Sequence, residues 1–428
     1  MSAYAQAGAK CPHPVSRFVL IRLPILALGA VALASCATGP EGGWLKGNLH
    51  THSLWSDGDE YPEMIIDWYK SNDYDFVALS DHNTLAVGER WIDAAESAGG
   101  MAAFDGYIAR FGEEWVEQRE ANGRLQVRLR TLEEYRGIFE EPGEFLVIQS
   151  EEITDRFETK SVHVNATNIA QLIRPQGGGS VLEVMQNNVN AVFEQRRRTG
   201  RPMFPHINHP NFGWSLTAED LVAVEGERFF EVYNGHPAVN NEGDDLRPST
   251  ERMWDIVLAE RLSQGLEVMF GIATDDAHNY HVLDERHSNP GRGWVMVRAV
   301  GLAAAEIVVA MEAGDFYASS GVELEDIVFE SGVLSLRIRP RDGVSYTTQF
   351  IGTRVGYPEA TEVNTAVEGA SVVKRYSDEI GAVFAEVSGP SPSYTLTGDE
   401  LYVRAKVISS RTKENPYRAG EPGHSRWS

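Results

Sequence analysis

The sequence predicts an α/β fold, in which a parallel barrel-like sheet is followed by a small antiparallel β domain. From residue 44 onward, short apolar runs alternate with longer amphipathic stretches, which is the pattern of repeated βα units. After residue 321 apolar and polar residues alternate with a period of two, as in residues 333–338 and 401–407, which indicates antiparallel strands. The 428 residues are 42% hydrophobic and 23% charged, so the chain can bury a sizeable core.

The barrel region divides into apolar runs, assigned to strands, and amphipathic stretches, assigned to helices. The expected strands are residues 45–49, 76–80, 145–150, 202–207, 229–233, 267–273 and 293–297. The expected helices are residues 60–71, 89–96, 131–139, 181–198 and 250–264. Residues 115–130 have Asn-Gly near their centre and are expected to form an inserted hairpin. The resulting boundaries are 44–322 for the barrel, 323–410 for the β domain and 411–428 for a tail.

The first 36 residues have the pattern of a bacterial secretory signal. Arg17 and Arg22 provide a positive flank, and residues 23–34 form an apolar run too short to span a membrane comfortably. The segment ends in Leu-Ala-Ser-Cys36, which resembles a lipobox. We therefore expect residues 1–35 to be a lipoprotein signal peptide, Cys36 to carry a lipid anchor and residues 36–43 to be a linker. Ala after the cysteine resembles lipoproteins of the outer membrane, so we expect the periplasmic face of that membrane.

The net charge of the chain limits which classes of macromolecule it can bind. The 38 Lys and Arg against 62 Asp and Glu give a net charge of −24, and such an acidic field repels phosphate backbones. Nucleic acid is therefore not an expected partner.

Cys11 and Cys36 are the two cysteines of the chain, so removal of the first and lipidation of the second would leave no thiol for an internal disulfide.

Seven of the 12 histidines lie in short polar segments near the ends of predicted strands. The segments are residues 50–58, 80–83, 151–154, 163, 206–210 and 276–278. Because a barrel brings its strand ends to one face, these side chains are expected to converge. They are histidines and carboxylates without cysteine, a set that suits Zn, Mn or Fe. The ligands outnumber those that one tetrahedral ion needs, so we expect two or three clustered divalent ions.

The individual segments leave some choices open. The His-x-His pair at residues 50–52 is at a strand end, where both rings can point to one side and reach one metal. In the third segment either Glu151 or Glu152 could supply the carboxylate. In the fifth segment either His206 or His209 could supply the imidazole.

Taken in order, the segments resemble the motifs of the polymerase and histidinol phosphatase (PHP) family of metal-dependent phosphoesterases. The resemblance runs from Gly47 to about His278 and includes all of the spaced motifs of the family. It implies a distorted (β/α)7 PHP-type barrel, so that the expected fold is this barrel with a small C-terminal antiparallel β domain. It also implies a cluster of three metal ions.

The resemblance assigns roles residue by residue. The implied metal ligands are His50, His52, Asp57, His82, Glu152, His163, His209, Asp276 and His278. Glu152 resembles the bridging carboxylate, and His209 is preferred to His206 because it precedes Pro as in the family pattern. Ser150, where many members have Gly, is a departure from that pattern. The residues expected to support the ligands from behind are Asp81, His206 and Glu231.

The implied function is hydrolysis of a small phosphate ester by a metal-bridging hydroxide. In this mechanism Glu152 and Asp276 hold the bridging positions. His209 or His206 would protonate the leaving alkoxide, because imidazole titrates near neutral pH. The expected catalytic residues are therefore Asp276, Glu152 and His209.

Two alternatives stay open. Residues 314–321, followed by a β domain, resemble the exported PHP-type hydrolases grouped with carbaryl hydrolase, so a carboxyl or carbamate ester could be the substrate. A phosphate clamp built from Lys160, Arg286 or Arg292 would favour a phosphate ester, and an apolar pocket of Trp and Phe would favour the carbonyl ester. A non-catalytic metal-containing lipoprotein would instead have a closed coordination shell.

Overall fold

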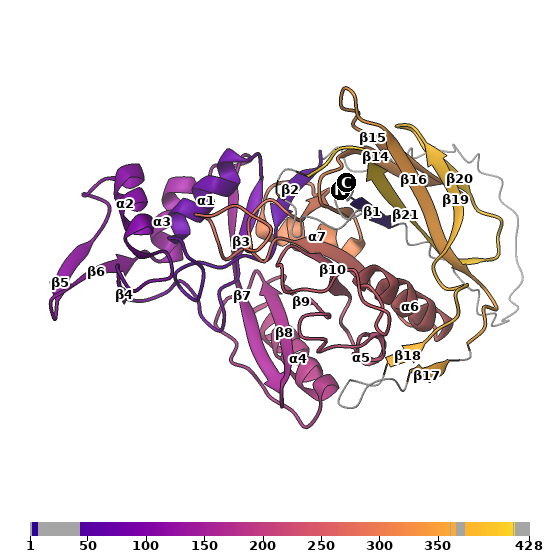
Figure 1. The fold of residues 1–428 in the computed structure, drawn as a ribbon, viewed down its shortest axis with the longest axis horizontal. Helices are drawn as coiled ribbons and strands as arrows, with labels where there is room; N and C mark the ends of the chain where they lie inside the picture. Colours follow the sequence, from indigo (N-terminus) through magenta and orange to yellow (C-terminus); the bar gives the residue numbers. More distant parts are fainter. Residues whose placement is uncertain (1, 7–42, 360, 365–372, 414, 416–428) are drawn as a thin grey trace, which may run out of the picture.

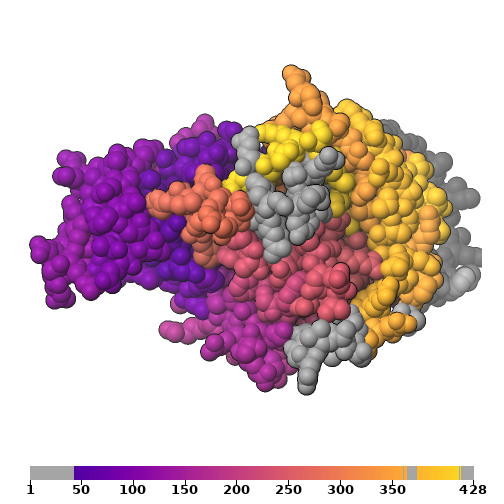
Figure 2. Space-filling model, viewed as in Figure 1, coloured from indigo at the N-terminus to yellow at the C-terminus, as the bar shows by residue number. Residues whose placement is uncertain are grey.

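The computed structural model describes residues 2–6, 43–359, 361–364, 373–413 and 415. Within these residues the chain has a mixed α/β fold, in which one large sheet curls into a nearly closed barrel beside three small antiparallel sheets (Figure 1). The C-terminal strands pack against one side of the barrel, and an inserted lobe projects from the opposite side (Figure 2). Among all the described residues, no helix is long and apolar enough to cross a membrane.

The large sheet has thirteen strands. In the order in which they pair, they are β11 (Phe270–Thr274), β10 (Phe229–Asn234), β9 (Phe204–Ile207), β8 (Lys160–Thr167), β7 (Leu146–Phe157), β3 (Phe76–Leu79), β2 (Leu45–Asn48), β12 (Trp294–Val297), β13 (Phe316–Ser319), β1 (Ser2–Gln6), β21 (Glu400–Ser409), β16 (Tyr346–Arg354) and β19 (Ala382–Ser388). The helices are α1 (Pro62–Ser71), α2 (Gly100–Phe111), α3 (Leu132–Phe139), α4 (Val181–Thr199), α5 (Ala218–Ala223), α6 (Thr250–Ser263) and α7 (Ala304–Ala313).

Most barrel strands lie close to their predicted bounds, but β7 runs seven residues beyond its predicted end, and the strands are not all parallel. β2, β3 and β7 form one parallel run, and β9, β10 and β11 form another. Between the two runs β8 pairs antiparallel with both β7 and β9, and β12 is antiparallel to β2 and β13. The sequence pattern did not predict β8 as a strand, because Asn165 and Thr167 on it are polar yet fully buried. The expected regular βα alternation therefore holds for only part of the barrel.

The inserted lobe corrects one prediction and confirms another. The predicted helix at 89–96 is wrong, because β4 (Arg90–Asp93) pairs antiparallel with β6 (Arg124–Leu129). Pairing with a neighbouring strand outweighs the weak helical preference of a four-residue segment. The predicted hairpin is confirmed, since β5 (Gln118–Ala121) turns into β6. Together with α2 these strands form the lobe at the left of Figure 1.

The predicted β domain consists of antiparallel strands. Its small sheets are β14 (Leu324–Glu330), β15 (Val333–Ile338) and β20 (Ser393–Thr395), and β17 (Glu362–Asn364) with β18 (Val373–Arg375). β21, β16 and β19 continue the large sheet, joined to the barrel through β1, which pairs antiparallel with β13 and β21. β1 lies in the segment expected to be a signal peptide, and Cys36 lies outside the described residues.

Phenyl rings fill the interior of the barrel. They belong to the first residues of β3, β9, β10, β11 and β13, and they are Phe76, Phe204, Phe229, Phe270 and Phe316. Four of these rings lie with their centroids 4.8 to 6.1 Å apart. Because apolar side chains occupy the amino ends of the strands, the polar residues that follow the carboxyl ends gather at the opposite end of the barrel.

Candidate metal centre

Backbone hydrogen bonds bring the first and last predicted motifs together. Asp276 N donates to His50 O and His52 N donates to Ala277 O, both at 2.9 Å. His82, which follows β3, and Glu152, in the middle of β7, form a further bridge. The segments after β2, β3 and β11 and the middle of β7 thus converge on one point, although their residues are far apart in the sequence.

Glu152 occupies the centre of the cluster. It is fully buried, and its Oε2 atom lies 3.4 Å from the Nε2 atoms of His50 and His52 and 2.8 Å from His82 Nδ1. Its Oε1 atom lies 2.9 Å from His163 Nδ1 and 3.4 Å from His209 Nε2. One carboxylate thus faces two sets of imidazoles, which is the position expected of a bridging ligand.

Asp276 and Asp57 lie on either side of this centre. Asp276 Oδ1 is 3.2 Å from His50 Nε2 and 3.1 Å from His52 Nε2. Asp57 Oδ1 is 3.4 Å from His278 Nε2, and its Oδ2 is 3.5 Å from His82 Nε2. Side chains of all nine predicted ligands therefore gather in one place.

Eight of these nine residues, together with His206 and Glu231, fall into groups that could each hold an ion, whereas Asp276 belongs to none of the groups. Four groups have ligand atoms within 4.8 Å of one another, and they are His50, His52 and Glu152; Glu152, His163 and His209; His52, Asp57, His82 and His278; and His50, His206 and Glu231. Glu152 is a member of two of them. The histidine nitrogens and carboxylate oxygens suit divalent cations.

Several of the buried ligand atoms are unsatisfied. Among the described residues, His50 Nε2 and His52 Nδ1 make no hydrogen bond, and Glu152 Oε2 makes none of normal geometry although His82 Nδ1 lies 2.8 Å away. A buried polar atom without a partner costs about 1–3 kcal/mol. Three such atoms within one cluster are therefore consistent with residues arranged for a bound cation.

The pKa directions describe the same cluster. Burial would raise the pKa of Glu152, but the neighbouring imidazoles, His82 first among them, lower it well below its usual range. Burial would also raise the pKa of Asp276, and His50 above all lowers it. Burial lowers the pKa of His52 to about 3. The two carboxylates are thus ionised and His52 is neutral. Burial would lower the pKa of His82, but Glu152 and Asp57 raise it to about 11, so without a metal this imidazole carries part of the balancing charge.

Glu231 connects several ligands from behind. His50 Nδ1 lies 2.6 Å from its Oε1 atom, which also accepts a hydrogen bond from Thr274 Oγ1 at 2.7 Å. Its Oε2 atom accepts from the backbone N–H of His209 at 2.7 Å and from Asn234 Nδ2 at 2.8 Å. A neutral His50 with its proton on Nδ1 would present Nε2 to a metal, so Glu231 selects the ring orientation and tautomer.

The other two predicted supporting residues lie in different places. Asp81 accepts hydrogen bonds from Ser53 N at 2.8 Å, Ser53 Oγ at 2.7 Å and Ser56 Oγ at 2.6 Å. It therefore holds the turn that leads to Asp57. The ring of His206 is fully buried, with Nε2 3.6 Å from Glu231 Oε1, so it lies beneath the cluster.

The neighbouring Glu151 points the other way. The side chains of consecutive strand residues alternate between faces, so Glu151 enters the core while Glu152 faces the cluster. Glu151 is fully buried, and its Oε1 atom accepts a hydrogen bond from Ile173 N at 2.6 Å. Burial raises the pKa of Glu151 to about 8, whereas the imidazoles lower that of Glu152.

Two amides that sequence reasoning missed support the carboxylates. Asn208 Nδ2 donates to Glu152 Oε1 at 2.8 Å, and Asn234 Nδ2 donates to Asp276 Oδ2 at 3.1 Å. Asn208 follows β9 and Asn234 is the last residue of β10, so both lie at strand ends, as several of the ligands do. This placement is the signal that could have found them. Two ligands also have positive φ angles, His209 at 21° and Asp276 at 49°, which is typical of backbone held in place at functional sites.

The three cations considered as a phosphate clamp are engaged elsewhere. Lys160 Nζ donates to Trp214 O at 2.9 Å. Arg286 is mostly exposed and pairs with Asp284 at 2.9 Å. The guanidinium of buried Arg292 donates to Gly235 O at 2.7 Å, among other contacts. None of the three has a recorded contact with a metal ligand of the described chain.

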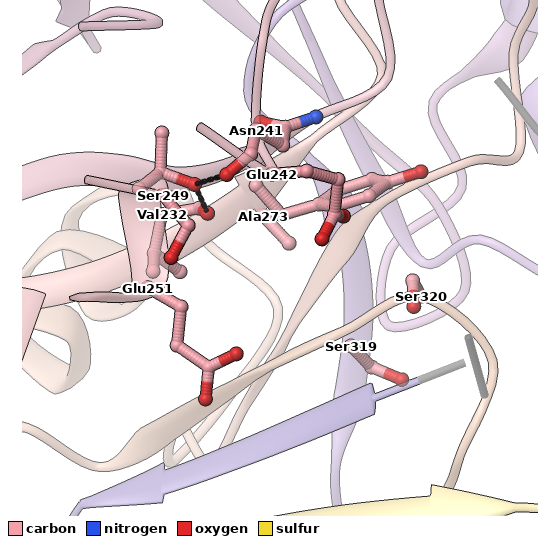
Figure 3. A pocket seen from close by; sticks show the side chains of 10 residues that line it. Val232, Asn241, Glu242, Ser249, Glu251, Ala273, Ser319 and Ser320 are labelled. Atoms are coloured by element: carbon pink, nitrogen blue, oxygen red, sulfur yellow. Dashed lines mark hydrogen bonds between the residues drawn. The ribbon is translucent and has the colours of Figure 1, made fainter. Parts of the chain in front are cut away.

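A separate cavity lies where β10, β11 and β13 meet the start of α6 (Figure 3). Its volume is about 50 Å³, and Glu251 and Ser319 are among its lining residues. Thr250 Oγ1 donates to Val232 O at 2.6 Å and to Asn241 O at 3.2 Å, which fixes the first turn of α6 on β10. None of the nine predicted ligands lines this cavity, so it belongs to the junction of barrel and C-terminal strands.

Comparison with known proteins gives distant likenesses. No family model matches the chain, and no curated protein matches it. A two-domain protein from Bacteroides vulgatus, containing a predicted PHP-like metal-dependent phosphoesterase, is 16% identical with a TM-score of 0.37, covering 85% of this chain and 87% of that one. An amidohydrolase from Chromobacterium violaceum, with bound sulfate and no metal, is 13% identical with a TM-score of 0.29, covering 55% and 88%. A protein from Bifidobacterium adolescentis described as a metal-dependent phosphoesterase is 14% identical with a TM-score of 0.27, covering 54% and 87%.

Proposed function

We propose that the protein is a metal-dependent hydrolase of small phosphate esters, of the PHP type that its motifs resemble. The observation that carries the proposal is the cluster of buried ligand atoms around Glu152 that lack partners in the described chain. Two or three divalent ions, Zn, Mn or Fe, would satisfy these atoms. The nine predicted ligands would hold them.

Bound ions would lower the pKa of a coordinated water and neutralise charge on the phosphoryl oxygens. The residues of the chain hold the ligands in place for this purpose. Glu231 orients the His50 ring, and the amide of Asn234 fixes Asp276. Asn208 does the same for Glu152. Such supporting contacts keep ligands in one geometry and avoid reorganisation during reaction.

His209 is assigned to the metal, with His163 and Glu152 as its neighbours. A ring nitrogen that binds a cation carries no proton, so ligation through Nε2 conflicts with proton donation from that atom. The predicted role of His209 as proton donor to the leaving alkoxide stays a prediction. His206 is fully buried beneath the cluster and is less suited to that role.

A second candidate function is hydrolysis of a carboxyl or carbamate ester at the same site. Two observations favour it. The three cations considered as a phosphate clamp are engaged elsewhere. The half-buried ring of Phe212 lies 5.1 Å from the ring of His209, so an apolar surface borders the ligands.

The test combines metal analysis of the purified full chain with turnover of three nitrophenyl esters, with and without chelator. We expect two or three ions per chain and chelator-sensitive cleavage of p-nitrophenyl phosphate or of bis-p-nitrophenyl phosphate. Cleavage of p-nitrophenyl acetate alone would replace the phosphoesterase by the carbonyl hydrolase. Metal-free protein that is inert toward all three esters would contradict both.

We also propose that the protein is a lipoprotein anchored through Cys36 on the periplasmic face of the outer membrane. Support comes from residues 17–36, which have the pattern of a signal with a lipobox. Cleavage before Cys36 would remove β1 and leave β13 and β21 without this neighbour. Intact mass of the membrane-extracted protein distinguishes a lipidated chain starting at Cys36 from the full chain, and Cys36→Ser should abolish the lipid mass.

A further inference from the structure

His236 lies beside the metal ligands but was not predicted to be one. It follows β10 in the turn that begins at Asn234. The backbone N–H of His236 donates to Asn234 Oδ1 at 2.8 Å, while Asn234 Nδ2 donates to Asp276 Oδ2 at 3.1 Å. A single amide therefore fixes both the ligand Asp276 and the start of the His236 turn.

The turn leaves little freedom to the backbone. A Cβ atom on Gly235 would lie 2.7 Å from Asp275 O and 2.7 Å from Arg292 Cβ, so glycine is needed for this close approach. The turn is thus packed tightly against the loop that carries Asp276. The backbone before His236 is therefore fixed relative to the loop of Asp276.

The ring of His236 is at the rim of the cluster. Its centroid lies 5.5 Å from that of His278 and 6.1 Å from that of Phe212, with the rings edge to face in both cases. His50 and His52 are fully buried, whereas His236 and Phe212 are partly exposed. Asp57, His82 and His278 are also partly exposed, so a molecule at the solvent side of the cluster would lie beside these ligands and the rings of His236 and Phe212.

The hydrogen bonds of the ring define its tautomer. Ala238 N donates to His236 Nδ1 at 3.1 Å, so Nδ1 is the acceptor and carries no proton. The proton of the ring is then on Nε2. Within the described chain Nε2 has no recorded hydrogen-bond partner, so a donor is available at the rim.

We propose that the Nε2–H group of His236 donates a hydrogen bond to an acceptor oxygen of the substrate ester, with Phe212 as the apolar wall beside it. The inference rests on the proposed function and deepens it. It makes His236 a substrate-contacting residue at a site where Lys160, Arg286 and Arg292 are engaged elsewhere. A neutral donor serves a phosphoryl oxygen or a carbonyl oxygen, which is the chemistry the two candidate substrates share.

Two substitutions separate this role from a structural one. In His236→Asn the amide can still accept from Ala238 N but does not reach the position of Nε2. In His236→Gln the amide nitrogen can reach that position and donate. His287→Gln is the matched control, since that histidine pairs with Asp284 at 2.6 Å and touches no ligand.

The readouts are metal content by mass spectrometry, kcat/KM for the preferred nitrophenyl ester, and affinity for inorganic phosphate measured calorimetrically on the metal-loaded full chain. We expect parental metal content in all three variants. For His236→Asn we expect kcat/KM and phosphate affinity to fall roughly ten- to a hundredfold, with His236→Gln closer to the parent and His287→Gln unchanged.

The inference would be overturned if His236→Asn kept the kcat/KM and phosphate affinity of the parent protein. It would also be overturned if this variant lost metal, because His236 would then support the metal cluster and not the substrate. Equal losses in the Asn and Gln variants would also reject the donor role. The parent protein could bind metal and phosphate but cleave no ester, and this result would overturn the proposed function alone. In that case weaker phosphate binding by His236→Asn would still support the donor role of His236. A parent that neither cleaves nor binds phosphate would overturn both.

Discussion

Two buried clusters of charged side chains in this molecule differ in how they are satisfied. Between α6 and β21, Asp255 accepts two hydrogen bonds from Arg404 at 2.8 and 2.7 Å, and Glu251 pairs with Arg404 at 3.0 Å and with Lys406 at 2.6 Å. Each acid in this α6–β21 ion cluster therefore has a permanent cation from the chain itself.

The metal centre has a different composition. Its carboxylates face imidazoles, and among the described residues no Arg or Lys contacts them. The acids of the first cluster are neutralised by Arg404 and Lys406, whereas the imidazoles and carboxylates of the second form a set that suits a divalent cation. This difference separates a structural ion cluster from a binding site, and the following predictions test it.

The largest expected effect is on the central carboxylate. Glu152→Gln removes the charge shared by two ligand groups, so we expect reduced metal content and a fall in the rate of hydrolysis by more than a hundredfold. This fall exceeds the 10–100-fold that is typical when a residue supporting a ligand is replaced. Glu151→Gln is the matched control on the other face of the same strand and should retain metal and activity. Comparable losses in both variants would mean that the substitutions act through the fold.

The next effect is on stability alone. Asp255→Ala leaves Arg404 buried with one partner fewer, so we expect the free energy of unfolding to fall by about 3–5 kcal/mol without loss of metal. Denaturant titration with metal analysis measures both. Glu194→Ala, which removes an exposed pair with Arg197 on α4, should cost about 0–1 kcal/mol. Metal loss in the Asp255 variant would show that the two clusters are coupled.

A smaller effect is expected for Glu231, because it acts through the ligands. Glu231→Gln weakens the orientation of His50, so metal affinity or activity should fall about 10–100-fold. The control is Glu227→Gln, a fully buried glutamate near the other end of β10 whose Oε1 accepts only from the backbone of Arg228 and Phe229. Titration of the metal-free protein with Zn²⁺ compares the two, and equal affinities would remove Glu231 from the support of the site.

The smallest effect is a pH dependence from Glu151. Burial raises its pKa to about 8 in the folded chain, from the ordinary value of 4.5 that applies to the unfolded chain. Between these values the unfolded state loses the proton that the folded state keeps, so folding stability falls as pH rises from about 4.5 to about 8. In Glu151→Gln this loss should disappear, because the amide has no proton to release over this range. Chemical denaturation at about pH 5 and about pH 8 measures it, and identical pH slopes for parent and variant would contradict the assignment.

The convergence of the ligands could be predicted because each ligand segment is recognised from its own short stretch of sequence. Most ligand segments are polar stretches near the end of an apolar run, so the barrel topology brings them together. The exception is His163, which lies within β8. The support by Asn208 and Asn234 could not be read in this way, since an asparagine after a strand is common in turns and has no distinctive spacing. Direction of pairing was also hidden, because β8 alternates in the same way whether it runs parallel or antiparallel to β7.

In the inserted lobe the sequence led to a wrong secondary structure. Residues 89–96 have a composition compatible with a helix, and only pairing with β6, more than thirty residues later in sequence, makes them a strand. β1 is a similar case, because its neighbours β13 and β21 lie more than three hundred residues away. Such long-range pairing leaves no signal in a short window of sequence.

The backbone bonds between the ends of β2 and β11 have a consequence for folding kinetics. His50 and Asp276 are joined across 226 residues by Asp276 N donating to His50 O, so this contact has a very high contact order. Contacts of this kind form late, because the entropy of closing so long a loop is repaid only when the intervening strands have docked. The metal centre is therefore assembled at the end of folding, and an incomplete chain emerging from the ribosome contains the early motifs but not the site.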